Sequence, residues 1–396
     1  MTNLHEPSTT TPDRGFPESE FRTRTSAAQA RLNERGIAAL LLTTEHEIRY
    51  FSGFHTPFWQ SPTRPWFLVV PNSGDPIAVV PSIGESAFRS SWLSDVRTWP
   101  APRPADDGIS LLTEVLAEVT RDRTAVIGVP MGPETHLRMP LADWHDLQRR
   151  SAAVRWTDAT DIVRGLRMVK SPREVEKTAH ICRIVSEAFA ELPNLLDVGI
   201  TEREAFRRFR IDILQRGADE VPYLVGGSGT HFDDIIKYPN DRVIAPGDLL
   251  MFDTGSMWDG YSSDFDRFFA FGHVDAAAAR AHHVVWDATE AGLAMLRPGV
   301  TTSDLWRTMA EVMSAGGSLG SGVGRLGHGL GMQLTEWPSN TADDNTVIEE
   351  GMVLTLEPGM TFAPGRVMLH EENVVIRSNG PELLSRRANR DIPIIA

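Results

Sequence analysis

Two aspartates within apolar stretches are the feature that most constrains how this chain can fold. Asp253 follows the apolar run Leu249–Phe252, and Asp264 lies within the Phe-rich run Tyr261–Phe271. A buried carboxylate costs free energy unless it is paired or binds a metal. The turn-forming Trp258-Asp259-Gly260 between the runs predicts a hairpin that places the two carboxylates side by side. This pair alone fits a turn cap or an ion pair as well as a metal site.

Three further candidate ligands lie at predicted strand edges or in a loop. His328 lies in the glycine-rich loop Gly316–Gly331, where flanking glycines would leave its imidazole accessible. Glu357 ends the predicted strand Met352–Glu357, and Glu372 precedes another apolar strand. Each has a structural explanation when taken singly. Together, four carboxylates and one imidazole match the ligands of two divalent ions, with Mn²⁺ favoured and Fe²⁺, Co²⁺ or Zn²⁺ as alternatives.

Strand-length apolar runs alternate with helical patterns in the first part of the chain, which is typical of an α/β domain. Residues 1–20 are rich in Thr, Pro, Ser and acidic residues and lack the apolar core of a secretory signal, so we expect a disordered tail there. The apolar runs are Ala38–Thr43, Ile48–Phe54, Trp66–Val70, Pro76–Val80 and Ala125–Val129, with helical patterns over Phe21–Arg35 and Leu111–Thr120.

A second region of mixed helices and strands follows. Ser171 with Glu174 and Thr201 with Glu204 are capping boxes, which predict helices to about Leu192 and over Thr201–Arg216. We therefore expect one domain over residues 21–166 and another over residues 167–396. Further helices are expected over Ala276–Leu296 and Thr302–Ala315, and further strands over Val367–Leu369 and Asn373–Arg377.

At the candidate ligands the sequence resembles the M24 metallopeptidases, a family that includes methionine aminopeptidase, aminopeptidase P, prolidase and the metal-free creatinase. The resemblance implies an α/β creatinase-like N-terminal domain and an α+β pita-bread catalytic domain, usually in a homodimer. The matching motifs are Phe252-Asp253-Thr254-Gly255, Ser263-Asp264-Phe265-Asp266-Arg267, Gly327-His328-Gly329-Leu330-Gly331, Glu357-Pro358-Gly359 and Glu372-Asn373-Val374.

The resemblance also implies roles for the five ligands. Asp253 would bind one metal ion, His328 and Glu357 would bind the other, and Asp264 and Glu372 would bridge both. A hydroxide that bridges two such ions would attack an amide-type bond. Glu357 would handle the proton of this water, which requires a carboxylate within hydrogen-bond reach.

The chain departs from the peptidases around the substrate. Ile236 and Thr335 take the places of two histidines that, in the family, contact the scissile amide and the oxyanion. Thr335 could still donate one hydrogen bond, and His231 could supply an imidazole or be a turn residue. Asp266 stands where Thr or Ser is usual, and could orient a ligand or pair with the neighbouring Arg267.

The loop from Phe54 to Trp66 could also contribute to substrate binding in a dimer. Arg64 could bind a substrate carboxylate and Trp59 could pack on the substrate, although both could simply pack within the loop.

Three functions follow from these features. The first is an Xaa-Pro aminopeptidase or dipeptidase. The second is a metal-dependent enzyme on a small non-peptide compound, by C–N hydrolysis or by elimination as in the related dimethylsulfoniopropionate lyase. That lyase has an aspartate where Gly255 stands, which weakens the comparison. The third is a non-catalytic binding protein, which loss of a metal ligand would favour, and none is lost.

The net charge of the chain limits the kinds of partner that it is expected to bind. The net charge of −14 argues against duplex nucleic acid or an anionic membrane as a partner, because both bind basic surfaces. No apolar run reaches the about 20 residues of a membrane span, and the single cysteine, Cys182, allows no internal disulfide. We therefore expect a cytoplasmic protein that acts on a small molecule or a short peptide.

Overall fold

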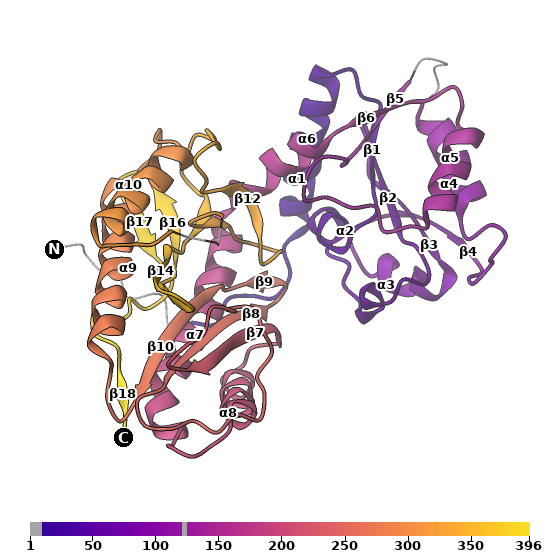
Figure 1. Ribbon diagram of the computed structural model, residues 1–396. Helices are drawn as coiled ribbons and strands as arrows, with labels where there is room; N and C mark the ends of the chain where they lie inside the picture. The colour runs from indigo at the N-terminus through magenta and orange to yellow at the C-terminus, as the bar shows by residue number, and fades with distance from the viewer. Residues whose placement is uncertain (1–9, 121–124, 321, 323) are drawn as a thin grey trace. The chain divides into compact units, whose positions relative to one another are not determined.

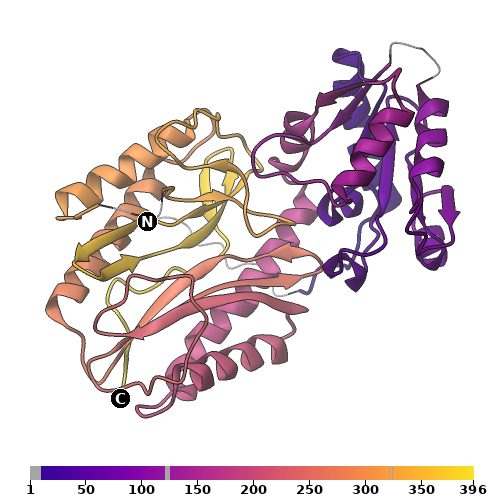
Figure 2. The same ribbon diagram turned by 45° about the vertical axis from the view of Figure 1, so that its right-hand side comes forward.

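The computed structural model describes residues 10–120, 125–320, 322 and 324–396 (Figures 1 and 2). Two compact units meet in the sequence between Arg167 and Met168. The first nine residues of the predicted tail lie outside the described residues. The prediction was wrong for its last residues, because helix α1 begins at Glu18 and an ion pair of 2.7 Å between Glu18 and Arg22 supports its first turn.

The N-terminal unit is built on a six-stranded mixed sheet in the order β4-β3-β2-β1-β5-β6. Strands β1, β2, β3 and β5 are buried throughout, as the continuous apolar runs predict. The elements are α1 (Glu18–Glu34), β1 (Ala39–Leu42), α2 (Glu45–Ser52), η1 (Pro57–Gln60), β2 (Phe67–Pro71), β3 (Ile77–Pro81), η2 (Ser82–Gly84), α3 (Glu85–Arg89), β4 (Asp95–Trp99), α4 (Ile109–Val119), β5 (Val126–Val129), α5 (Leu141–Arg150), β6 (Arg155–Asp158) and α6 (Thr160–Arg167).

One apolar run of this unit is helical. Ile48–Phe54 forms the end of helix α2 and the residues after it, where Gly53 adopts φ +76° and ends the helix. The run buries Ile48 and Phe51, which are three positions apart and therefore share one helix face. A short apolar run fits a buried helix as well as a strand.

The C-terminal unit contains two larger sheets and a two-stranded ribbon. One sheet has the order β18-β10-β8-β7 with β9 beside β8, and the other has the order β12-β11-β13-β16-β17. The elements are α7 (Pro172–Leu195), α8 (Glu202–Gln215), β7 (Glu220–Gly229), β8 (Leu249–Trp258), β9 (Tyr261–Ser262), β10 (Phe265–Phe271), α9 (Ala276–Met295), α10 (Thr302–Ala315), β11 (His328–Gly329), β12 (Glu336–Ser339), β13 (Val353–Leu356), β14 (Gly359–Ala363), β15 (Arg366–Leu369), β16 (Glu372–Arg377), β17 (Gly380–Leu383) and β18 (Ile394–Ile395).

Each larger sheet of this unit is associated with its own pair of helices. Helices α7 and α8 pack with β7 and β8, whereas α9 and α10 pack on each other and α9 contacts β14 and β15 (Figure 1). The predicted capping box at Ser171 is present, since its side chain accepts from the Glu174 amide and Glu174 bonds back to the Ser171 amide.

The two helix pairs are connected in the same way. Gly199 donates to the carbonyl of Ile244 at 2.9 Å, and Gly299 donates to that of Ile348, also at 2.9 Å. Each glycine lies two residues before the threonine that caps the second helix of its pair. The unit therefore consists of two halves with matching local construction.

The predicted hairpin forms, with one interruption that matters for the site. Strand β8 pairs with both β9 and β10, and the pairing breaks at Ser263 and Asp264. The residue directly opposite Asp253 is therefore Asp266 rather than Asp264. Asp264 directly precedes the first residue of β10. Its backbone is outside the strand pairing, so other groups can fix its position.

No helix in the described part of the chain combines the length and apolarity that crossing a membrane would require.

A buried ion pair ties the start of the C-terminal unit to the loop after His328. Lys170 Nζ lies 3.0 Å from Glu336 Oε2, and both side chains are buried. Glu336 also accepts from the Gln333 amide at 3.1 Å, and its carboxylate oxygens would lie only 2.9 and 3.0 Å from a Cβ on Gly331. This pair holds the loop that carries Thr335.

We expect Lys170→Met to destabilise the protein by about 3–5 kcal/mol, because the buried carboxylate of Glu336 loses the cation of its ion pair. Adding Glu336→Leu to that variant should recover most of the loss, since no uncompensated charge then remains. Urea unfolding measures both effects. The control is Arg307→Met, which breaks an exposed pair with Asp304 and should leave the midpoint unchanged. A Lys170→Met variant as stable as the control would contradict this role.

Candidate metal centre

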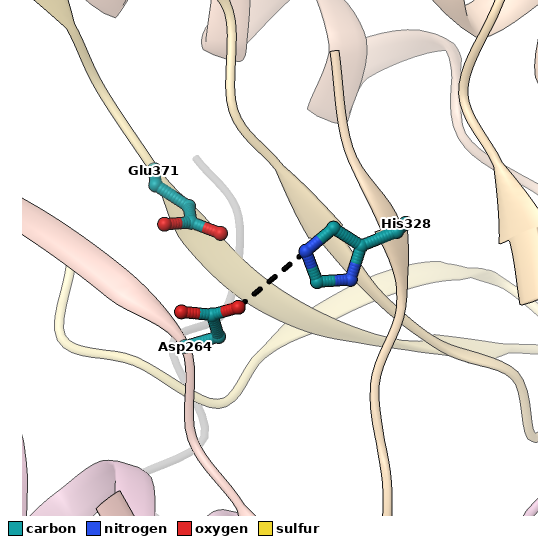
Figure 3. Close-up of side chains that lie close together, drawn as sticks. All are labelled: Asp264, His328 and Glu371. Carbon is teal, nitrogen blue, oxygen red and sulfur yellow. Dashed lines mark ion pairs between the residues drawn. The ribbon is translucent and has the colours of Figure 1, made fainter. Parts of the chain in front are cut away.

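Three side chains from separate parts of the C-terminal unit converge in its interior. The ligand atoms of Asp264, His328 and Glu371 all lie within 4.8 Å of one another, and all three residues are buried (Figure 3). His328 Nε2 is 3.4 Å from Asp264 Oδ2 and 4.0 Å from Glu357 Oε1. A carboxylate-rich group with one imidazole is a ligand set for a divalent metal ion.

The imidazole of His328 is held with one nitrogen toward the carboxylates. Its Nδ1 lies 2.9 Å from the carbonyl oxygen of Gly329, and because a carbonyl only accepts, Nδ1 carries the hydrogen. Nε2 is then the nitrogen with the free electron pair, and it is the atom that faces Asp264. The His328 amide donates to Thr355 Oγ1 at 3.1 Å, which fixes the backbone as well. Such outer contacts orient metal-binding histidines.

Asn373 aims Asp264. Its Oδ1 accepts from the Asp264 amide at 2.9 Å, and its Nδ2 donates to the Asp264 carbonyl, so one side chain replaces the missing strand partner. Cys182 Sγ donates to the same Oδ1 at 3.2 Å. Cys182 therefore supports the site from a buried position on α7.

Glu357 and Arg325 lie next to each other at this cluster. Glu357 follows β13, and its amide donates to the carbonyl of Leu326 at 3.2 Å. Arg325 Nε lies 3.9 Å from Glu357 Oε1. Burial raises the pKa of Glu357, the charge of Asp264 raises it further, and the charge of Arg325 opposes the rise.

Asp253 lies on β8 in contact with Tyr223 of β7, whose side chain shares a hydrogen bond with it. Burial raises the pKa of Asp253 well above its ordinary range, and the charges of Asp264 and Glu357 raise it further. Asp266, opposite Asp253, is also buried with a raised pKa. The Arg267 guanidinium contacts Asp266 through its backbone carbonyl, to which Nη1 donates at 2.6 Å, and not through its carboxylate.

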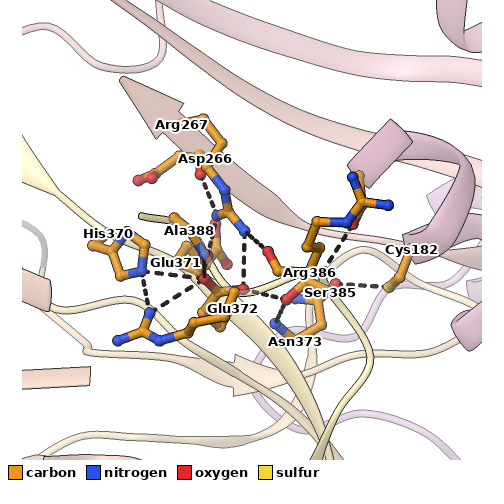
Figure 4. A network of polar contacts seen from close by, with 12 residues as sticks. Cys182, Asp266, Arg267, His370, Glu371, Glu372, Asn373, Ser385, Arg386 and Ala388 are labelled. Carbon is orange, nitrogen blue, oxygen red and sulfur yellow. Dashed lines mark hydrogen bonds and ion pairs between the residues drawn. The ribbon is translucent and has the colours of Figure 1, made fainter. Parts of the chain in front are cut away.

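The structure places Glu371, rather than the predicted ligand Glu372, in the cluster. Glu371 faces Asp264 and His328 (Figure 3), because adjacent residues on an extended chain point to opposite sides. Glu372 lies on the other side, where Arg267 Nη2 is 2.9 Å and Arg387 Nη1 is 3.2 Å from its carboxylate (Figure 4). The Ser385 hydroxyl and the Ala388 amide also donate to it.

The two glutamates have opposite pKa shifts, which identify their surroundings. Burial raises the pKa of Glu371 well above its ordinary value, and the carboxylates of Asp264, Glu357 and Asp253 raise it further. Burial would also raise the pKa of Glu372, but Arg267, His370 and Arg387 outweigh this and hold it far below the ordinary value. Glu372 is already neutralised by protein cations, whereas Glu371 is not.

Unsatisfied oxygens test whether metal ions fit here. Asp253 Oδ1, Asp266 Oδ1 and Glu371 Oε1 are buried without a hydrogen-bond partner. Buried carboxylate oxygens of this kind are costly unless a cation binds them. The residues therefore fit divalent ions, with Asp253, Asp264, His328, Glu357 and Glu371 as the donor set.

The three predicted substrate residues of the C-terminal unit lie in different surroundings. Thr335 Oγ1 accepts from Arg325 Nη2 at 3.5 Å, so it lies beside a group that contacts the cluster. His231 is exposed, and its Nδ1 lies 3.1 Å from the hydroxyl of Thr230. Ile236 is 69% exposed. Reasoning from the sequence missed Glu371, Arg325 and Tyr223, of which strand alternation could have indicated Glu371.

Trp59 and Arg64 are described within the N-terminal unit. Trp59 is buried against Phe54 and Trp66, and the guanidinium of Arg138 lies 5.0 Å from its ring centroid. Arg64 has φ +57° and lies over the ring of Phe58. These contacts account for both as packing residues of the loop, and a contact with substrate stays a prediction.

Comparison with known proteins agrees with this architecture. Residues 176–378 match the profile described as metallopeptidase family M24, and residues 24–169 match the Creatinase/Prolidase N-terminal domain. The chain belongs to metallopeptidase family M24. The resemblance seen in the motifs is thereby confirmed, as are the creatinase-like N-terminal domain and the pita-bread catalytic domain. As a member of this family, the chain is a hydrolase.

Its relatives include peptidases of several bacteria. The chain is 29% identical to the probable dipeptidase PepE of Mycobacterium tuberculosis over 92% of its own length and 93% of that protein. It is 26% identical to the Xaa-Pro dipeptidase of Lactobacillus delbrueckii subsp. lactis, over 84% of its own length and 88% of that protein. The crystal structure of dipeptidase PepE from Mycobacterium ulcerans superposes with a TM-score of 0.84 at 27% identity, covering 96% of this chain and 99% of that chain.

Matched variants of the adjacent glutamates distinguish their roles. After loading with Mn²⁺ and dialysis, we expect the wild type to retain about two ions per chain by elemental analysis. Glu371→Gln should lose metal, because it removes an uncompensated carboxylate from the cluster. Glu372→Gln should keep its metal but lose about 3–5 kcal/mol of stability, since Arg267 and Arg387 lose their buried partner. Metal loss in Glu372→Gln alone would reverse the assignment.

Proposed function

We propose that this chain is a two-metal dipeptidase that hydrolyses the amide bond of short peptides, Xaa-Pro dipeptides among them. The observation that carries the proposal is the convergence of Asp264, His328 and Glu371 in a buried, carboxylate-rich cluster. The similarity of the chain to dipeptidases along nearly its whole length supports short peptides as the substrates.

In this proposal, two divalent ions would be held by five donors, namely Asp253, Asp264, His328, Glu357 and Glu371. Bound divalent ions would lower the pKa of a water molecule and polarise the substrate carbonyl. Oxygen-rich donors favour Mn²⁺. We also propose a homodimer in the cytoplasm.

Glu357 is the proposed proton acceptor. It is the carboxylate nearest His328 Nε2 after Asp264, and it stands next to Arg325, whose charge favours its ionised form. An ionised carboxylate in this place can take a proton from the attacking water and deliver it to the leaving nitrogen.

A second function is favoured by one observation. Ile236 and Thr335 replace two histidines of the peptidases, and Ile236 has no side-chain donor at all. This supports hydrolysis or elimination on a small non-peptide compound at the same centre. A binding protein without catalysis is disfavoured, because the donor set is complete.

A panel of dipeptides tests the proposal. We expect the Mn²⁺-loaded protein to hydrolyse Xaa-Pro or other dipeptides, with activity lost on chelation and restored by metal. Asp264→Ala should lose metal and activity together, because it removes a central donor. A fully loaded protein that hydrolyses none of the dipeptides would reject the peptidase and leave the non-peptide function.

A further inference from the structure

A partly exposed cation stands beside the buried carboxylates. Arg325 Nε is 3.9 Å from Glu357 Oε1, and its Nη2 is 3.5 Å from Thr335 Oγ1. The side chain of Arg325 is 29% exposed, compared with 7% for Asp264 and 4% for His328. Arg325 therefore connects the interior of the cluster with the solvent from which a substrate arrives.

The backbone directly after Arg325 is held by several contacts. The next residue, Leu326, donates to the carbonyl of Asn340 at 2.9 Å and accepts from the Glu357 amide. Gly327 accepts from the Asn340 amide at 2.8 Å. Its φ is +135°, and a Cβ there would lie 2.2 Å from the carbonyl oxygen of Thr355. Arg325 thus directly precedes a well-bonded segment next to Glu357.

Thr335 is anchored from the other direction. The next residue, Glu336, forms the buried pair with Lys170, and strand β12 begins there. A guanidinium and a hydroxyl, both hydrogen-bond donors, therefore meet at one place beside Glu357. Both of these contacts of Arg325 are longer than the about 2.7–2.9 Å of a tight charge-assisted hydrogen bond.

A guanidinium in this place is a donor for a negatively charged oxygen. Its N–H groups and positive charge can stabilise an oxygen that becomes negative during a reaction. Arg325 lies beside Glu357, the proton acceptor of the proposed function, so it is placed where such an oxygen would form.

We propose that Arg325, oriented by Thr335, is a catalytic residue that donates a hydrogen bond to the oxyanion formed from the scissile carbonyl. This inference rests on the proposed amide hydrolysis at the same centre.

The step is balanced as follows. The water oxygen bonds to the carbonyl carbon, one of its protons passes to Glu357, and the C=O π pair becomes a lone pair on the oxygen beside Arg325. The C–N bond then breaks with its electron pair going to nitrogen, which takes the proton from Glu357. The C=O bond re-forms, giving a carboxylic acid and an amine.

Phosphate binding tests this role without turnover, because phosphate is a tetrahedral oxyanion. Calorimetry on Mn²⁺-loaded wild type should show phosphate binding that is absent from the metal-free protein. Arg325→Gln should bind phosphate about 10- to 100-fold more weakly with unchanged metal content. Arg307→Gln, an exposed arginine of α10, is the matched control and should bind normally. No phosphate binding by the wild type, equal binding by Arg325→Gln, or loss of metal from that variant would overturn the proposal.

Kinetics on any dipeptide that the wild type hydrolyses give the second test. Arg325→Gln should lower kcat by about 10²–10³-fold with little change in KM, as for removal of one oxyanion donor. Added guanidinium ion at low millimolar concentration should restore part of the activity of Arg325→Ala, which a purely structural role would not allow. Unchanged kcat would overturn the proposal. If the wild type hydrolyses no dipeptide, the proposed function fails, and the phosphate experiment still decides the role of Arg325.

Discussion

Repulsion among buried carboxylates is the constraint on which the C-terminal unit depends. Asp253, Asp264 and Glu371 would separate or bind protons if they were free to do so. Neutral side chains fix the backbone at two of the candidate ligands: Asn373 bonds to the backbone of Asp264, and Thr355 bonds to that of His328. The cost of gathering these charges is met by rigid surroundings and, in the proposed function, by metal ions.

Much of this arrangement can be predicted from the sequence, because it depends on local rules. The box at Ser171 and the hairpin around Asp259 follow from short-range chemistry. Asp253, Asp264, His328 and Glu357 could be found because each breaks an apolar or glycine-rich pattern. The start of α1 and the helical state of Ile48–Phe54 could not be predicted, since tertiary packing decides them.

The choice between Glu371 and Glu372 shows where reasoning from sequence stops. Both precede the same apolar strand, and a shift of one residue exchanges the two faces. Arg267 and Arg387 decide which glutamate faces the cluster, because both lie on the side of Glu372 only. They belong to distant segments. The contact between Arg325 and Thr335 could not be predicted either, because the two residues are ten positions apart with strand β11 between them.

The two halves of the C-terminal unit each supply part of the candidate metal centre. Asp253 and Asp264 come from the half that contains α7 and α8, whereas His328, Glu357 and Glu371 come from the half that contains α9 and α10. The centre therefore lies where the two halves meet. Divalent ions bound there would join the halves, and without them the like charges of Asp253, Asp264 and Glu371 face one another.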